Sequence, residues 1–237
     1  MVRYMNTIAT MTNPIINLED VEIFQLEEKL FKNITLKINS GDFIYLIGET
    51  GSGKSSLLKV LYAELKINKG NITVAGIDLK KIKSKDIPNL RRKLGIVFQD
   101  FQLLSDRTVF ENLSFVLNAT GWSDKTKISK RIDEVLESVH LSGVKEKMPY
   151  TLSGGEQQRA AIARSLLNYP EIILADEPTG NLDPDKSEKI IELLKEINAT
   201  GTTIIIATHD YAIMKKYAAR TINCSNKGVS EIDINHE

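Results

Sequence analysis

The residues best suited to chemistry stand in one glycine-rich stretch, Gly48-Glu49-Thr50-Gly51-Ser52-Gly53-Lys54-Ser55. An apolar run, 43–47, precedes it, and Ser56 to Leu61 reads as the start of a helix. This is the GxxxxGK[ST] pattern, whose backbone N–H groups point at an anion while the helix N-terminus adds its positive end. Lys54 would reach the terminal phosphates of a nucleotide, and the Ser55 hydroxyl would ligate Mg²⁺. The alternative is a glycine-rich turn capping an ordinary helix.

Two adjacent carboxylates, Asp176 and Glu177, end a second apolar run at 172–175. Strands buried on both faces of a parallel sheet read as such runs, and open α/β sheets bind ligands at the carboxyl ends of their strands. Asp176 suits a Mg²⁺ role, and Glu177 could orient and deprotonate an attacking water. Because two neighbouring carboxylates are costly to bury without a cation, the pair favours a metal site.

Three further side chains are ambiguous when taken singly. Gln99 follows the apolar stretch 95–98, and His209 follows the buried strand expected at 202–207. A histidine at a strand end is more often structural than catalytic, although this one falls on the same predicted sheet edge as Gly48 and Asp176. Phe24 could stack on an adenine ring, although residue type alone favours core packing for an aromatic residue there.

Two helix starts carry capping signals. In the stretch 152–159, LSGGEQQR, Ser153 is a candidate N-cap and Glu156 completes a capping box. Capping does not explain Gly154 and Gly155, since glycine in a first turn costs stability relative to alanine and would instead permit close approach of a group such as a phosphate. Asp183 followed by proline is sufficiently explained as an N-cap with proline at N1.

Composition bounds the class of protein. The chain has 237 residues, enough for one large domain or a domain with a small subdomain, and 31 basic against 31 acidic residues. This balance gives no field that would favour nucleic acid. The single cysteine, Cys224, excludes an intramolecular disulfide and suits core packing. No apolar run is long enough to span a membrane, so a soluble or peripheral protein is expected. Residues 1–13, with a second plausible start at Met11, are expected to be a disordered extension.

Polar–apolar alternation predicts strands at 15–24, 34–38 and 71–75, which would form a small antiparallel sheet. Helical stripes cover 109–120 and 128–139, and no strand is expected between 99 and 151, so this block reads as a helical insertion. The tail predicts a hairpin of 220–223 and 229–233.

Together these stretches resemble the ATP-binding cassette ATPases from about Pro14 to the C-terminus, with seven family elements in family order. The resemblance implies a P-loop NTPase (RecA-like) α/β core, 14–98 and 158–237, with a small antiparallel β-subdomain and an inserted helical subdomain, 99–157. It implies ATP and Mg²⁺ as ligands and a head-to-tail homodimer. The roles that it implies are adenine stacking by Phe24, nucleotide and metal contact by Gln99, and γ-phosphate contact across the dimer by Ser153 and Gly155. Gly154 and Gln157 belong to the same nucleotide-binding signature, and further site roles fall to Asp183 and His209.

A closer resemblance, to the cell-division branch of that family, rests on the stretches 98–112 and 179–185. It implies a polytopic membrane partner, control of cell-wall hydrolases and a place on the cytoplasmic face of the membrane. The expected docking segment is 99–110, with Leu103, Leu104 and Arg107 as candidates. Ser105 replaces a proline common in that branch.

Three alternatives stay open. ATPases of lipoprotein-release and macrolide-export systems share the stretch 179–183 nearly as well. Soluble cassette proteins acting on nucleic acid or ribosomes usually carry two cassettes or a long coiled coil, so no nucleic-acid partner is expected. A nucleotide-sensing scaffold with weak turnover is the third.

Overall fold

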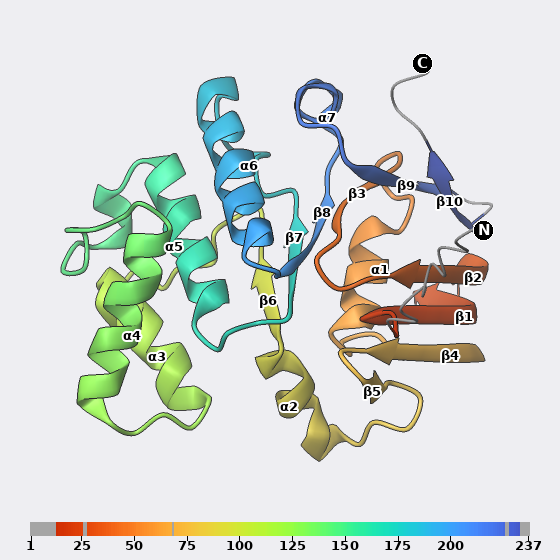
Figure 1. The fold of residues 1–237 in the computed structure, drawn as a ribbon, viewed down its shortest axis with the longest axis horizontal. Helices are drawn as coiled ribbons and strands as arrows, with labels where there is room; N and C mark the ends of the chain where they lie inside the picture. Colours follow the sequence, from red (N-terminus) through yellow and green to blue (C-terminus); the bar gives the residue numbers. More distant parts are fainter. Residues whose placement is uncertain (1–12, 26–27, 68, 226–227, 233–237) are drawn as a thin grey trace, which may run out of the picture.

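Two β-sheets and a group of helices make up the part of the chain that the structure describes, residues 13–25, 28–67, 69–225 and 228–232 (Figure 1). The structure is a computed structural model. None of the helices within these residues is long and apolar enough to cross a membrane. The expected extension at 1–13 lies outside the described residues except for Asn13, as does the turn of the predicted tail hairpin at 226–227.

The larger sheet has six strands in the order β10-β9-β3-β8-β7-β6. All neighbouring pairs from β9 to β6 are parallel, and β10 pairs antiparallel with β9. Their bounds are β3 Phe43–Ile47, β6 Leu94–Val97, β7 Ile172–Asp176, β8 Thr203–Ala207, β9 Arg220–Ser225 and β10 Gly228–Ile232. The parallel strands place their carboxyl ends at one edge, as the sequence predicts.

The smaller sheet is antiparallel, in the order β2-β1-β4-β5. Its strands are β1 Ile16–Gln25, β2 Glu28–Ile38, β4 Lys69–Val74 and β5 Ile77–Asp78. The alternation that predicted a strand at 34–38 marks only the second half of β2. The first half forms because β1 offers partners along its whole length, down to the Gln25–Glu28 pair.

Helices cover both faces of the larger sheet (Figure 1). They are α1 Lys54–Leu61, α2 Ile87–Arg92, α3 Val109–Ala119, α4 Lys125–Ser138, α5 Gly154–Leu166, α6 Pro184–Ala199 and α7 Tyr211–Lys216, with short 3₁₀ turns at Ser84–Asp86 and Pro149–Thr151. The predicted helices at 109–120 and 128–139 match α3 and α4. Helix α5 crosses residue 157 without a break, so one rigid helix joins the expected helical subdomain to the expected core.

Alternate residues of the central strands feed two hydrophobic cores. In β3, Tyr45 and Ile47 pack with the side that carries α3 to α6, whereas Ile44 and Leu46 pack with α1 and the small sheet. The period-2 alternation of a strand thus buries both faces of the sheet. Cys224 of β9 is buried in the second core, and burial raises the pKa of its thiol to about 12, in agreement with a packing role.

Candidate nucleotide-binding and catalytic site

Every predicted strand-end residue of the site emerges at the same sheet edge. The glycine-rich stretch follows β3, Gln99 follows β6, and Glu177 follows β7 directly. His209 comes two residues after β8, the strand that lies between β3 and β7 in the sheet. Polar side chains from four strands therefore share one rim, because the parallel pairing aligns the strand ends.

The glycine-rich stretch forms a tight loop around a buried lysine. Lys54, at 8% exposure, donates from Nζ to the carbonyl oxygens of Gly48 and Glu49 at 2.7 and 3.1 Å. Gly53 precedes α1 with φ of 94°, in the left-handed region that glycine adopts freely. The lysine ammonium is held inside the loop by backbone oxygens, at the N-terminus of a helix whose first amides suit an anion.

Two glycines of this loop are required by close neighbours. A Cβ on Gly48, whose φ is 144°, would lie 2.2 Å from the carbonyl oxygen of Cys224 on β9. A Cβ on Gly53 would lie 2.4 Å from the ring of Phe31, which β2 of the small sheet contributes. Phe31 of the small sheet therefore packs against the loop at Gly53. Sequence patterns do not reveal this contact, because Phe31 precedes the loop by 17 residues.

The loop also contains a polar group that has no hydrogen-bond partner among the described residues and that a nucleotide phosphate could bind. The Ser52 hydroxyl is buried and, within the described part of the chain, has no hydrogen-bond partner. Buried hydroxyls are normally satisfied, so this one is available to a ligand. Ser55 is exposed at the start of α1, while Ser56 is buried beside it. Glu49 and Thr50 are exposed at the tip of the loop.

Glu177 and His209 form a direct pair across the rim. Nδ1 of His209 lies 2.8 Å from Oε1 of Glu177, whose side chain is 17% exposed. The backbone of Glu177 is in the left-handed region, with φ of 49°, and its N–H donates to the Ala207 carbonyl at 2.9 Å. Ala207 at the end of β8 thus fixes the backbone of Glu177, and His209, two residues later, contacts its side chain. The preceding residue, Asp176, is half-buried and pairs with Ala207 in the sheet.

Gln99 is exposed and reaches the loop that follows Glu177. Its carbonyl accepts from Asn181 Nδ2 at 2.8 Å, and its side-chain amide lies 3.5 Å from Asn181 Oδ1. A Cβ on Gly180 would lie 2.8 Å from the Gln99 amide nitrogen, so a side chain at this position would displace that amide. Sequence reasoning gave no role to Asn181, because its partner is 82 residues away.

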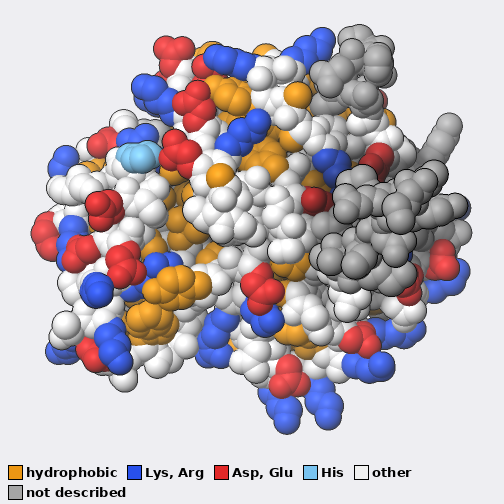
Figure 2. All heavy atoms as spheres, in the orientation of Figure 1, with side chains coloured by type: hydrophobic (Ala, Val, Ile, Leu, Met, Phe, Trp, Pro, Cys, Tyr) orange, Lys and Arg blue, Asp and Glu red, His pale blue; other side chains and the backbone are white. Residues whose placement is uncertain are grey.

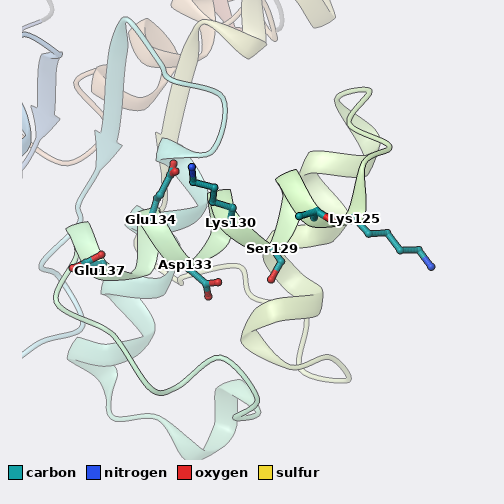
Figure 3. A pocket seen from close by; sticks show the side chains of 7 residues that line it. Lys125, Ser129, Lys130, Asp133, Glu134 and Glu137 are labelled. Atoms are coloured by element: carbon teal, nitrogen blue, oxygen red, sulfur yellow. The ribbon is translucent and has the colours of Figure 1, made fainter.

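A hollow of about 630 Å³ opens beside the pair of Glu177 and His209. The loop 179–184 forms one wall, and α7 with Lys216 and Tyr211 forms another. A further hollow of about 610 Å³ runs along the exposed face of α4 (Figure 3). Its lining comes from one helix, and in Figure 3 the labelled Lys125 and Glu137 point away from one another, so it is a solvated helix face.

Figure 2 shows basic and acidic side chains interspersed over the visible face, in keeping with the balanced charge.

The predicted signature forms the start of α5, on another part of the molecule from the glycine-rich loop (Figure 1). Ser153 is the N-cap, and both halves of the capping box with Glu156 are present, with Ser153 Oγ donating to Glu156 at 2.6 Å. Cβ atoms on Gly154 and Gly155 would lie 3.2 and 3.3 Å from Leu182 and Lys186. These glycines let α5 approach the start of α6 in the same chain. The half-buried Gln157 donates to the Leu152 carbonyl at 3.1 Å.

Two other predicted residues, Asp183 and Phe24, lie at a helix start and on a strand of the small sheet. Asp183 is the exposed N-cap of α6, and its hydrogen bonds to the Lys186 side chain and backbone hold the pKa of this carboxyl below its usual range. Phe24 is half-buried on β1 opposite Lys29, in a sheet whose β1 strand contacts α1.

The segment expected to dock a partner is only partly exposed. Leu104 is 40% exposed, but Leu103 packs against the larger hydrophobic core. Arg107 stacks over the ring of Phe115, a residue 50% exposed on α3, with 4.9 Å between the guanidinium carbon and the ring centroid. Phe115, a residue to which the sequence analysis assigned no role, thus joins Leu104 and Arg107 in a small surface.

Comparisons with known proteins agree with this geometry. Residues 31–180 match the ABC transporter family. The cell division ATP-binding protein FtsE of Bacillus subtilis is 47% identical over 194 residues, covering 82% of this chain and 85% of that protein. The proteins of the same name from Streptococcus pneumoniae strain D39 and Escherichia coli K12 are 46% and 40% identical over 195 residues, which cover 82% of this chain and 84% and 87% of those proteins.

Solved structures give the same answer. The dimeric ATP-binding cassette MJ0796, in a post-hydrolysis state with ADP and Pi, superposes with a TM-score of 0.80 at 34% identity, over 92% of this chain and 98% of that one. CbiO1 of Clostridium perfringens, part of the ABC transporter complex cbiONQ, gives 0.84 at 32% identity, over 92% and 87%. The chain belongs to the ABC transporter family and is an ATP-hydrolysing cassette of that family.

Proposed function

We propose that this ATPase works as one half of a head-to-tail homodimer and drives an FtsX-like polytopic membrane protein in bacterial cell division. The observation that carries the dimer is the separation of two half-sites. The glycine-rich loop and the capped start of α5 lie on different parts of one chain (Figure 1). A second copy, turned head to tail, would bring Ser153 and Gly155 to the γ-phosphate held by the first.

Each site residue then has a defined task. Lys54, the loop amides and Ser52 hold the phosphates, and Phe24 covers the adenine. Ser55, Gln99 and Asp176 would hold Mg²⁺, which supplies charge neutralisation on the phosphate oxygens when bound. Asp176 is the only carboxylate among these three ligands. This is sufficient, because Mg²⁺ typically binds through one or two carboxylates together with substrate phosphates.

Hydrolysis is an in-line attack by water on the γ-phosphate. Glu177, held by the Ala207 carbonyl and by His209, would orient the water and accept its proton. When the γ-phosphate is present, His209 would turn its hydrogen bond to it. The donors of Lys54 and the loop stabilise the developing charge, which is usually the largest contribution to such catalysis.

The dimer is tested by the variant Glu177→Gln with MgATP in size exclusion. We expect a stable dimer with ATP and a monomer without it. The matched control adds Ser153→Asp, because aspartate is also a good N-cap and keeps α5 intact while placing a negative charge against the partner's γ-phosphate. The double variant should stay monomeric. A dimer that ignores both ATP and Ser153→Asp would contradict the proposal.

The membrane partner is argued from Leu104, Arg107 and Phe115, an apolar and cationic surface formed by the segment that follows Gln99 and by α3. The relatives named FtsE support the cell-division assignment, and the chain would then sit peripherally at the cytoplasmic face of the membrane. Arg107→Glu should weaken co-purification with the FtsX-like protein and spare ATP binding, and Lys130→Glu on α4 is the control. Co-purification with the membrane subunit of a lipoprotein-release or macrolide-export system instead would favour those alternatives.

A further inference from the structure

The segment after Gln99 has an unusual backbone. Phe101 and Gln102 are consecutive non-glycine residues in the left-handed region, with φ of 58° and 49°. The Gln102 N–H donates back to the Asp100 carbonyl at 2.6 Å. Such conformations persist only where surrounding contacts hold them, and they occur at switch regions.

A single side chain from another element holds this turn. Arg164 of α5 donates from Nη2 to the Phe101 carbonyl at 2.9 Å and from Nη1 to the Gln102 carbonyl. The guanidinium is planar and presents its donors as a fixed fork, so it fixes the relative orientation of two successive carbonyls. Burial lowers the pKa of Arg164 and the charge of Asp100 raises it, but an arginine stays charged in either case.

A second clamp fixes the rest of the segment from a different helix. Asn112 of α3 is buried at 3% exposure. Its amide nitrogen donates to the carbonyls of Leu104, Arg107 and Thr108, and its oxygen accepts from the Leu104 N–H. The exposed part of the docking segment is therefore tied to α3, whereas the turn that links it to Gln99 is tied to α5.

The same helix α5 begins at the signature. Arg164 stands ten residues after Gly154 in an uninterrupted helix, about 15 Å along its axis. Because α5 is continuous, we expect its two ends to move together as one rigid body. A displacement of Ser153 and Gly155 toward a partner's nucleotide would therefore displace Arg164 and, with it, the carbonyls of Phe101 and Gln102.

We infer that Arg164 is a positioning residue that couples nucleotide engagement at the signature to the conformation of the turn at Phe101 and Gln102. This inference rests on the proposed dimer. In this inference Arg164 neither contacts the substrate nor transfers a proton. It only transmits movement from the start of α5, at the signature, to the turn that Arg164 binds.

The test is amide hydrogen exchange of the peptide spanning 100–104, in the Glu177→Gln background, with and without MgATP. We expect ATP to change exchange in this peptide several-fold, and Arg164→Gln to abolish the change while the ATP-dependent dimer still forms. Arg131→Gln is the matched control, because Arg131 of α4 also donates to two carbonyls, of Leu166 and Leu167, at the same C-terminal end of α5, but not to the turn at Phe101 and Gln102. This control should keep the response.

A further variant separates coupling from simple support. Gln102→Gly makes the left-handed turn easy to adopt, so in the double variant with Arg164→Gln it should restore protection without restoring the response to ATP. Recovery of the ATP response in the double variant would overturn the inference, as would an unchanged response in Arg164→Gln. Equal loss in Arg131→Gln would overturn it as well. Failure of the Glu177→Gln protein to dimerise with ATP would overturn the proposed function and the inference together, whereas a dimer with no change at 100–104 overturns the inference alone.

Discussion

Nδ1 of His209 lies 2.8 Å from Oε1 of Glu177, so a side-chain contact directly beside the hollow of about 630 Å³ joins the segments that follow β8 and β7. The two partners differ in access, since the histidine is 71% exposed and the carboxylate 17%. The exposed ring can rotate toward an incoming phosphate, while Glu177 stays fixed by its backbone bond to Ala207. In the proposed mechanism Glu177 would therefore serve as a fixed base and His209 as a mobile contact for the γ-phosphate.

Replacing His209 by alanine should lower kcat for ATP more than it raises KM. In the proposed mechanism the histidine positions Glu177 and contacts the γ-phosphate, whereas the Lys54 loop carries most of the binding. Steady-state kinetics of His209→Ala and Glu177→Gln check this, with a loss of about 10²–10⁴-fold in kcat for the latter. An unchanged kcat with a raised KM in His209→Ala would assign the ring to binding alone.

Gly48→Ala and Gly51→Ala form a matched pair. Both glycines have positive φ, 144° and 83°, but a Cβ on Gly51 meets nothing within 4 Å, whereas one on Gly48 would collide with the Cys224 carbonyl. Gly51→Ala should cost about 1–2 kcal/mol in the free energy of unfolding, the left-handed penalty alone. Gly48→Ala should cost clearly more and lose ATP binding. Urea unfolding measures the first effect and a nucleotide-binding assay the second; equal losses would contradict the structural difference.

Lys54→Met should abolish stabilisation by ATP. In the parental protein, nucleotide at 100 times its Kd should add about 2.7 kcal/mol to the free energy of unfolding by mass action. The variant removes the ammonium that bonds to the Gly48 and Glu49 carbonyls, and methionine keeps the buried stem. Thermal unfolding with and without ATP is the measurement. A shift of the same size in Lys54→Met would remove this residue from the site.

Local pattern and family resemblance predicted most of the strands, the shared edge at which they end and the capping box at Ser153, but neither β5 nor the capping box at Thr108 and Glu111. The glycines at 48 and 53 were predicted as parts of the loop, but not the reasons for them, since Cys224 and Phe31 come from other strands. Arg164, Asn112 and Asn181 were not predicted. Each satisfies backbone or side-chain groups of a distant loop, and no period or spacing records such a bond. Leu103 looked as available as Leu104, and only tertiary packing separates them.

Glu156 should make stability depend on pH in the acidic range. Its hydrogen bonds with the Ser153 hydroxyl and N–H hold the pKa of the carboxyl below its usual value of 4.5. A folded-state pKa below the unfolded one means that the contribution is fully present above about pH 5 and is lost as the pH falls through the folded value. Urea midpoints followed from pH 6 downward should show this loss, and Glu156→Gln should flatten it. An unaltered profile in the variant would assign the pH dependence to other groups.

Gln158 offers a test of how α5 is packed. Its side chain is fully buried, and within the described residues neither of its amide atoms has a hydrogen-bond partner. A buried amide without partners costs more than an apolar side chain of similar shape, so Gln158→Met should raise the free energy of unfolding by about 1 kcal/mol. The adjacent Gln157→Met is the matched control, because Gln157 donates to the Leu152 carbonyl at 3.1 Å and its loss should lower stability by a similar amount. Urea unfolding measures the free energy of unfolding of both variants and shows whether the two substitutions act in opposite directions. A destabilised Gln158→Met would contradict this and mean that ordered water inside the chain satisfies the amide.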